Sequence, residues 1–289
     1  MPVIVVTSAN QGAGKTAVAA TIARHAAYAG RSVQLVRVAS NDARSHATAD
    51  ADWYGTLFFT PNSNPVPVAW GDIPQPTREE LIVVEADADT VPEGHGYPVV
   101  TVGREGTPTD RSAAATVITR THRSDVWVEG EMGTNLTLHL PEDRTLNGFT
   151  VDEARQMLHA ETLVEGDETD VTCDYLVIAP IASDAGQPYF KRFPSKAVVA
   201  RFDKTDMHLA AMQARPNVLI LSGGRRPSEY LFDAAGAQGI PVLLSRTDTE
   251  NTVITLERIF DRTRFVGERK LERMAGLLDG TPLYEALGL

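Results

Sequence analysis

The chain has one cysteine, Cys173, and no excess of positive charge among its 289 residues. A single cysteine cannot form an intramolecular disulfide, and it excludes every CxxC-type zinc or redox motif. The 38 acidic residues against 27 basic ones give a formal net charge of −11, so no global positive field exists to hold a nucleic-acid backbone or an anionic membrane. We therefore expect a cytoplasmic protein without nucleic-acid or membrane partners.

Long apolar stretches and targeting signals are also missing. The first apolar run, Val3 to Val6, ends at Thr7-Ser8, and no stretch approaches the roughly 18 apolar residues that a membrane-spanning helix needs. Neither the H-E-x-x-H pattern of zinc proteases nor the G-x-S-x-G pattern of serine hydrolases occurs, so we expect the histidines to be surface or packing residues. The length is about twice that of a typical domain and predicts two compact units.

The first unit has the pattern of a parallel α/β sheet. Val3 to Val6 predicts a buried strand, and a small-residue loop and an alanine-rich helix follow it. Further buried strands are predicted at 32–38, 81–84, 98–102 and 116–119. Residues 41–73 show no clean period and contain several prolines, which predicts an irregular excursion.

The pattern changes to short alternating runs at residues 125–148, which predict a connecting hairpin. We accordingly expect a first domain at 1–124, a connecting segment at 125–148 and a second α/β domain at 149–289. In the second domain, Thr150 and Glu153 form a capping-box pattern ahead of a helix. Strands are expected at 175–179, 196–202, 218–221 and 241–244, with helices after the last three, and 268–278 predicts an amphipathic packing helix.

A glycine-rich loop between the first strand and the first helix predicts nucleotide binding. The alternative is a plain small-residue turn, but a Gly-Lys-Thr sequence in this context favours a phosphate-binding loop of the Walker A type. Free backbone amides and the helix N-terminus would bind phosphates, Lys15 would neutralise the outer phosphates, and Thr16 would ligate magnesium. The predicted cofactors are ATP or another purine triphosphate, such as GTP, and Mg²⁺. The predicted nucleotide-binding residues are Asn10, Gln11, Gly12, Ala13, Gly14, Lys15, Thr16 and Ala17.

The N-terminal segment resembles a known group of P-loop proteins. The strand, the Ser8-Ala9-Asn10-Gln11-Gly12-Ala13-Gly14-Lys15-Thr16 loop and the small-residue helix are similar to those of dethiobiotin synthetase, of the cobyrinic acid diamide synthase group and of the P-loop domain fused to some phosphotransacetylases. Ala9 stands where the common loop pattern has its first glycine.

The second unit resembles a DRTGG domain. The resemblance lies in segments 140–144, 202–206, 222–228 and 239–243, together with Asp248-Thr249. The elements that give the domain its name stand here as Asp203-Lys204-Thr205 and Ser222-Gly223-Gly224. The two resemblances imply a P-loop NTPase-like parallel sheet followed by a smaller α/β DRTGG-like domain, with a homo-oligomer expected by analogy.

A magnesium-nucleotide site needs a carboxylate beyond the loop threonine. The resemblance places one at Glu85, at the end of the strand 81–84, although Ala86 replaces the family's glycine. It places another in the Asp-Ala-Asp element Asp50-Ala51-Asp52, where we take Asp52 with Glu85 and Thr16 as metal ligands. Arg37 is a candidate catalytic residue beside Lys15. The relatives carry a lysine there, and an arginine is a poorer match to proton handling.

Three strand ends of the second unit offer candidate ligand-binding groups, because ligands bind at the carboxyl edge of open α/β sheets. Gly223-Gly224 before a helix near Pro227 predicts an amide nest for an anion, and the alternative is a tight turn with solvent-facing arginines. The candidate residues are Asp203, Lys204, Thr205, Gly223, Gly224, Arg225 and Asp248.

These patterns leave three functions open. The first is an ATP-binding protein, hydrolysing slowly or not at all, whose DRTGG-like domain senses an unknown small molecule or mediates assembly. The second is an ATP-dependent ligase that activates a carboxylate or carbamate in the manner of dethiobiotin synthetase. The third is a degenerate scaffold, which the intact Lys15 and Thr16 argue against.

Overall fold

The computed structural model describes residues 2–8, 10–43, 45–77, 79–108, 110, 112–133, 136–167, 171–179 and 188–289. The chain forms two compact units: unit 1 comprises residues 1–143 and 265–289, and unit 2 comprises residues 144–264. Both are mixed α/β units with parallel sheets. The expected boundaries differ at two places, since 125–143 and the C-terminal segment 265–289 both belong to unit 1.

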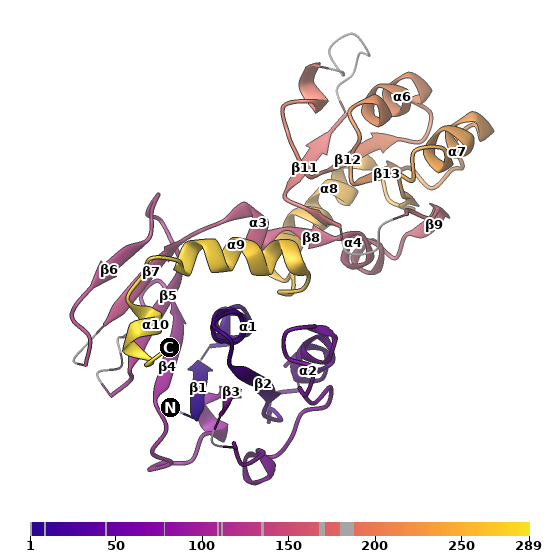
Figure 1. Cartoon of the computed structure of the whole chain (residues 1–289). Coiled ribbons are helices and arrows are strands. Elements are labelled where there is room, and N and C mark those ends of the chain that lie inside the picture. Colours follow the sequence, from indigo (N-terminus) through magenta and orange to yellow (C-terminus); the bar gives the residue numbers. More distant parts are fainter. Residues whose placement is uncertain are drawn as a thin grey trace. The chain divides into compact units, whose positions relative to one another are not determined.

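Unit 1 contains a seven-stranded sheet in the order β2-β3-β1-β4-β5-β7-β6 (Figure 1). All neighbouring strands are parallel except β6 and β7. The strands are β1 (Val3–Ser8), β2 (Ser32–Arg37), β3 (Glu80–Asp87), β4 (Val99–Arg104), β5 (Ala115–Thr121), β6 (Trp127–Glu129) and β7 (Thr137–Pro141). The predicted hairpin is present, because β6 and β7 pair antiparallel. It extends the sheet of unit 1 rather than only connecting the two units, because β7 also pairs in parallel with β5.

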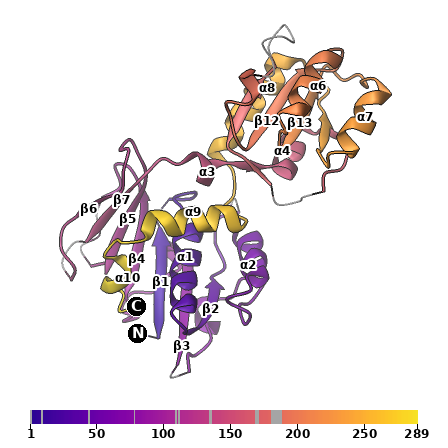
Figure 2. The same ribbon diagram turned by 45° about the horizontal axis from the view of Figure 1, so that its top comes forward.

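Two helices that pack together in unit 1 come from distant parts of the chain. α1 (Lys15–Tyr28) follows β1, and α9 (Glu268–Leu278) packs beside it, as Figures 1 and 2 show. Leu271, Met274 and Leu278 are buried along one face of α9, at helical spacing. α10 (Leu283–Ala286) ends the chain. Within the described ranges, every helix is too short or too polar to cross a membrane.

The stretch expected to be irregular contains a helix, α2 (Ala47–Thr56). Its small and acidic residues lack a clear apolar stripe, so periodicity did not predict it. Short 3₁₀ helices are η1 (Trp70–Asp72) and η2 (Ala88–Thr90). Loop residues Val68, Trp70 and Ile73 pack on the apolar side chains of β1, β2 and β3, so an extended segment covers this part of the sheet.

Unit 2 contains a five-stranded sheet in the order β11-β12-β13-β14-β9, and a separate antiparallel pair, β10-β8. The strands are β8 (Phe149–Thr150), β9 (Glu161–Val164), β10 (Thr172–Cys173), β11 (Tyr175–Ile178), β12 (Lys196–Arg201), β13 (Val218–Ser222) and β14 (Val242–Leu244). The helices are α3 (Arg144–Asn147), α4 (Val151–Leu158), α6 (Thr205–Gln213), α7 (Glu229–Gly236), α8 (Thr249–Glu257) and the 3₁₀ helix η3 (Arg258–Asp261).

Alternation along the strands builds two cores on the sheet of unit 2. Val198 and Leu219 pack on the side that includes α6 and α7, whereas Val199 and Ile220 pack on the side that includes α4 and α8. The predicted capping box is confirmed, because the Thr150 hydroxyl accepts from the Glu153 amide and the Glu153 carboxylate accepts from the Thr150 amide. The helices predicted after β12, β13 and β14 are also present.

Candidate functional site

The glycine-rich loop of unit 1 joins the end of β1 to the start of α1. Ser8 closes its first turn, since its hydroxyl donates to the Asn10 carbonyl (2.8 Å) and accepts from the Asn10 amide (3.0 Å). Gly14 occupies the N-cap of α1 with φ 98°, a left-handed conformation that favours glycine. Asn10, Gln11 and Gly12 are exposed, whereas Ala13 and Ala17 are buried. Ala9, where the glycine pattern departs, lies outside the described residues.

The backbone N–H groups of residues 11–17 have no acceptor among the described residues. Four amides at a helix N-terminus always lack an intrahelical partner, and a side-chain cap commonly satisfies one of them. The N-cap residue of α1 is a glycine, and the first turn contains no acidic residue. A run of free amides at the positive end of a helix is the arrangement that binds anions.

Lys15 points into a buried group of charges at the carboxyl end of β3. Its ammonium is ion-paired with Asp87, and both residues are 8% exposed. Asp87 also accepts from the Arg37 guanidinium, whose Nη2 lies 3.2 Å from Oδ1. Burial alone would raise the pKa of Asp87, but hydrogen bonds from Lys15 and Ser40 and the charges of Lys15 and Arg37 outweigh it, so the pKa is lowered.

Glu85 is the centre of this group. It is 1% exposed, and its Oε1 accepts from the Thr16 hydroxyl at 3.0 Å while its Oε2 accepts from the Tyr54 hydroxyl at 2.5 Å. The Arg37 Nε lies 3.7 Å from Oε1, which is an ion-pair distance but not a hydrogen bond. The structure therefore brings together Lys15, Thr16, Arg37 and Glu85, all of which the sequence analysis had selected.

The acidic pair on α2 is divided between the two faces of that helix. Asp50 is 8% exposed, and its charge acts on both Tyr54 and Arg37. Asp52 is exposed. Residues two apart on a helix are separated by about 200°, so only one of the two can face the buried group. Of the two, Asp50 is the residue that lies toward Arg37 and Tyr54, whereas the predicted metal ligand Asp52 is exposed.

The residues of this group suit a magnesium ion that is held partly by a ligand. The described residues contain no cluster of three or more His, Cys, Asp or Glu side chains that could hold a metal ion unaided. Mg²⁺ usually takes one or two protein oxygens and completes its octahedron with water and phosphate oxygens. Thr16 and Glu85 offer two such oxygens at the N-terminus of α1, next to the free amides.

The second-unit candidates lie at a common edge of their sheet, because β12, β13 and β14 are parallel neighbours. Most of them are engaged within the fold. Asp203 pairs with Arg201 (2.9 Å), and Asp248 caps α8 by accepting from the Asn251 amide (2.8 Å). Lys204 is the N-cap residue of α6 and Thr205 its first residue, and the Arg225 guanidinium lies over the ring of Phe202 at 5.7 Å.

The amide nest predicted at Gly223-Gly224 is not formed. The Gly223 amide donates to the Thr247 carbonyl (2.7 Å), and the Gly224 amide donates to the Ser245 carbonyl (3.0 Å). Both glycines have positive φ, which lets the chain turn tightly against the loop after β14. The alternative, a tight turn, describes this segment, so these two amides are engaged within the fold.

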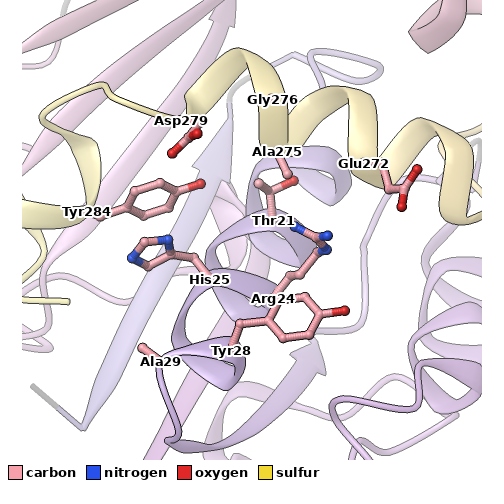
Figure 3. Close-up of a pocket in the computed structure, with 10 residues that line it drawn as sticks. All are labelled: Thr21, Arg24, His25, Tyr28, Ala29, Glu272, Ala275, Gly276, Asp279 and Tyr284. Atoms are coloured by element: carbon pink, nitrogen blue, oxygen red, sulfur yellow. The ribbon is translucent and has the colours of Figure 1, made fainter.

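A separate cavity of about 480 Å³ lies along α1, away from the glycine-rich loop, where α9 and α10 meet the C-terminal half of that helix (Figure 3). His25 stacks on Tyr284 with ring centroids 3.6 Å apart, and Arg24 lies over the ring of Tyr28. Burial lowers the pKa of His25, against the opposing charge of Asp279, and burial raises the pKa of Tyr284 to about 12. His25 is thus a packing residue, as the sequence analysis expected.

Sequence reasoning missed Asp87 and Tyr54. A signal for Asp87 was present: Glu85 and Asp87 stand two apart on one strand, so their side chains share a face of the sheet. No comparable signal marks Tyr54, which reaches Glu85 from a helix that periodicity did not predict.

Comparison with known proteins finds a family match within unit 2 and a similar solved structure. Residues 153–259 match the family model of the DRTGG domain. The chain is also similar to a crystal structure of the CBS and DRTGG domains of the regulatory region of Clostridium perfringens pyrophosphatase, determined in complex with the activator diadenosine tetraphosphate. That similarity has a TM-score of 0.36 and 16% sequence identity, and it covers 48% of this chain and 64% of that chain. The protein therefore contains a DRTGG domain, which lies within its second unit.

Proposed function

We propose that unit 1 binds a purine nucleoside triphosphate with Mg²⁺ and that the DRTGG domain is a sensory or assembly module coupled to it. The observation that carries the proposal is the run of amides at residues 11–17, which have no acceptor in the part of the chain that the structure describes and lie beside the Lys15 ammonium. Together they offer several hydrogen-bond donors and one positive charge at the end of a helix, which is what a polyphosphate chain requires. A plain turn between a strand and a helix would not need a buried lysine.

Charge balance in the buried group supports a divalent cation. Lys15 and Arg37 lie among the carboxyl groups of Asp50, Glu85 and Asp87, so acidic side chains outnumber basic ones in this group. Thr16 and Glu85 would hold the ion, and the ion would neutralise phosphate oxygens. Arrival of the phosphates would draw Lys15 away from Asp87, whose charge Arg37 would continue to balance.

Coupling between the units has a physical route through α9. This helix follows directly from unit 2 in the chain, and it packs on α1, whose first turn carries Lys15 and Thr16. A change in unit 2 that strains the segment before α9 would act on the helix that presents the nucleotide-binding groups. The ligand of the DRTGG domain would be a small molecule bound by side chains at the carboxyl edge of its sheet.

The ligase alternative finds less support. Activation of a carboxylate needs a cationic group free to clamp the substrate beside the γ-phosphate. Arg37 is 2% exposed, and its guanidinium contacts the Val38 carbonyl and the carboxylates of Glu85 and Asp87. These bonds leave it balancing internal charge rather than facing a substrate.

Calorimetric titration with ATP and GTP, with and without Mg²⁺, tests the proposal. Lys15→Ala should weaken Mg-nucleotide binding by about 10- to 100-fold, because a charge-assisted hydrogen bond to phosphate is lost. Lys191→Ala, at an exposed lysine, serves as the matched control and should bind as the wild type does. Wild-type protein that binds neither nucleotide would contradict the proposal. Product formed from ATP and a small carboxylate would favour the ligase, whereas binding without turnover would favour the sensor.

A further inference from the structure

Two side chains from the middle of the sheet contact consecutive carbonyls of the glycine-rich loop. The Arg104 guanidinium donates to the Gly12 carbonyl (3.1 Å), and the Thr119 hydroxyl donates to the Ala13 carbonyl (2.8 Å). Arg104 ends β4, and Thr119 is its register partner on β5, so the two side chains lie next to each other. Neither residue belongs to the charged group around Glu85.

The geometry of the peptide bond links these contacts to the free amides. In a trans peptide, the carbonyl of one residue and the N–H of the next point in opposite directions. Holding the Gly12 and Ala13 carbonyls toward β4 and β5 therefore turns the Ala13 and Gly14 N–H groups away from them. Neither N–H has an acceptor among the residues that the structure describes.

Both glycines of the loop make room for this arrangement. Gly12 and Gly14 have φ of 66° and 98°. A Cβ on Gly12 would lie 3.0 Å from the Arg104 Nη2, and a Cβ on Gly14 would lie 3.5 Å from the Thr119 Cγ2. A larger residue at Gly12 would push Arg104 away, so the loop backbone and the side chains behind it fit each other closely.

We infer that Arg104 and Thr119 are positioning residues that orient the Ala13 and Gly14 amides to receive the phosphates of the nucleotide. The inference rests on the proposed nucleotide binding and adds to it the residues that prepare the loop. Amide donors held in place before the ligand arrives lose less conformational entropy on binding, so removal of Arg104 or Thr119 lowers the affinity through its effect on the loop.

Substitution of Thr119 with isosteric and conservative residues tests this role. Thr119→Val removes only the hydroxyl and should weaken binding of Mg-ATP and of inorganic tripolyphosphate by about five- to tenfold, whereas Thr119→Ser should restore wild-type affinity. Thr121→Val is the matched control, because the Thr121 hydroxyl lies on the same strand but donates to Leu140 in β7 (3.0 Å) rather than to the loop. This control loses a similar hydrogen bond and should keep wild-type affinity.

Each outcome decides a separate point. If wild-type protein binds ATP and Thr119→Val binds it equally well, the positioning role is wrong while the proposed function stands. If wild-type protein binds neither ATP nor tripolyphosphate, both fall. Should Thr119→Val fail to fold, Arg104→Met provides the second test, because Arg104 lies at a strand end and is only half-buried. Arg104→Met should lose affinity for Mg-ATP and for tripolyphosphate as Thr119→Val is expected to do. Unchanged affinity for both ligands would overturn the inference.

Discussion

Glu85 shows how one buried carboxylate can serve two purposes. It accepts hydrogen bonds from Thr16 and Tyr54 and faces Arg37, so its charge is compensated inside the fold. Burial and the negative charge of Glu85 raise the pKa of Tyr54, which keeps that phenol protonated as a donor. The same carboxylate is, with Thr16, a ligand of the metal ion in the proposed function.

Glu85→Gln should reduce the gain in nucleotide affinity that Mg²⁺ provides by about tenfold, because the amide keeps the side chain's size but loses its charge. Asp89→Asn is the control: Asp89 is exposed, and its carboxylate accepts from Asn41 at 3.5 Å, away from Thr16. Titrations with and without Mg²⁺ measure both variants. If Glu85→Gln and Asp89→Asn changed the Mg²⁺-dependent affinity equally, Glu85 would not be a ligand of the metal ion.

The contact between α1 and α10 includes a histidine whose pKa is lowered by burial. His25 on α1 stacks on Tyr284 of α10 with an interplanar angle of 4° (Figure 3). Since burial lowers the pKa of His25, the unfolded chain takes up this proton at a higher pH than the folded protein does. Stability from this contact is therefore present above pH about 6.5 and is lost as the pH falls below that value.

His25→Phe should make the thermal stability of unit 1 less dependent on pH between about 7 and 5, because the ring is kept and the titrating group is removed. Calorimetric scans across this range measure the effect. His122→Phe is the control, since the His122 side chain is 92% exposed. If the melting temperatures of the wild type and of His25→Phe changed in parallel with pH, His25 would not be the titrating group.

At the scale of the whole molecule, the chain passes from unit 1 to unit 2 and then returns. Asp143 stands just before the first crossing, and Arg273 of the returning helix α9 donates to its carboxylate at 2.7 Å. Both residues belong to unit 1, so the outgoing and returning segments are joined there. The C-terminal segment is therefore part of unit 1.

Deletion of residues 265–289 should destabilise unit 1 and leave unit 2 unchanged. Loss of a single buried Leu or Met typically costs about 2–5 kcal/mol, and α9 contributes several to unit 1, including Leu271 and Met274. Differential scanning calorimetry of the full and shortened chains would separate the two unfolding transitions. Glu272→Ala, at an exposed position of α9, is the control. If the deletion instead lowered the unfolding temperature of unit 2, the segment would stabilise the unit that contains the DRTGG domain.

Local sequence signals predicted much of the structure. Buried strands were recognised because runs such as Val3 to Val6 are apolar and β-branched, and α4 because Thr150 and Glu153 cap it. The loop around Lys15 was recognised because its residues are contiguous. Each of these features depends on neighbours within a few positions of the chain.

Long-range features depended on the tertiary structure. Lys15 pairs with Asp87, and Asp50 rather than Asp52 is buried. Arg104 and Thr119 contact the glycine-rich loop. These arrangements depend on residues from separate elements. The sequence alone determined most of the strands and helices and the small-residue loop between β1 and α1, because those follow from local propensity and period. Only the tertiary structure decided which side chains surround that loop and to which unit α9 belongs, because packing between distant segments selects them.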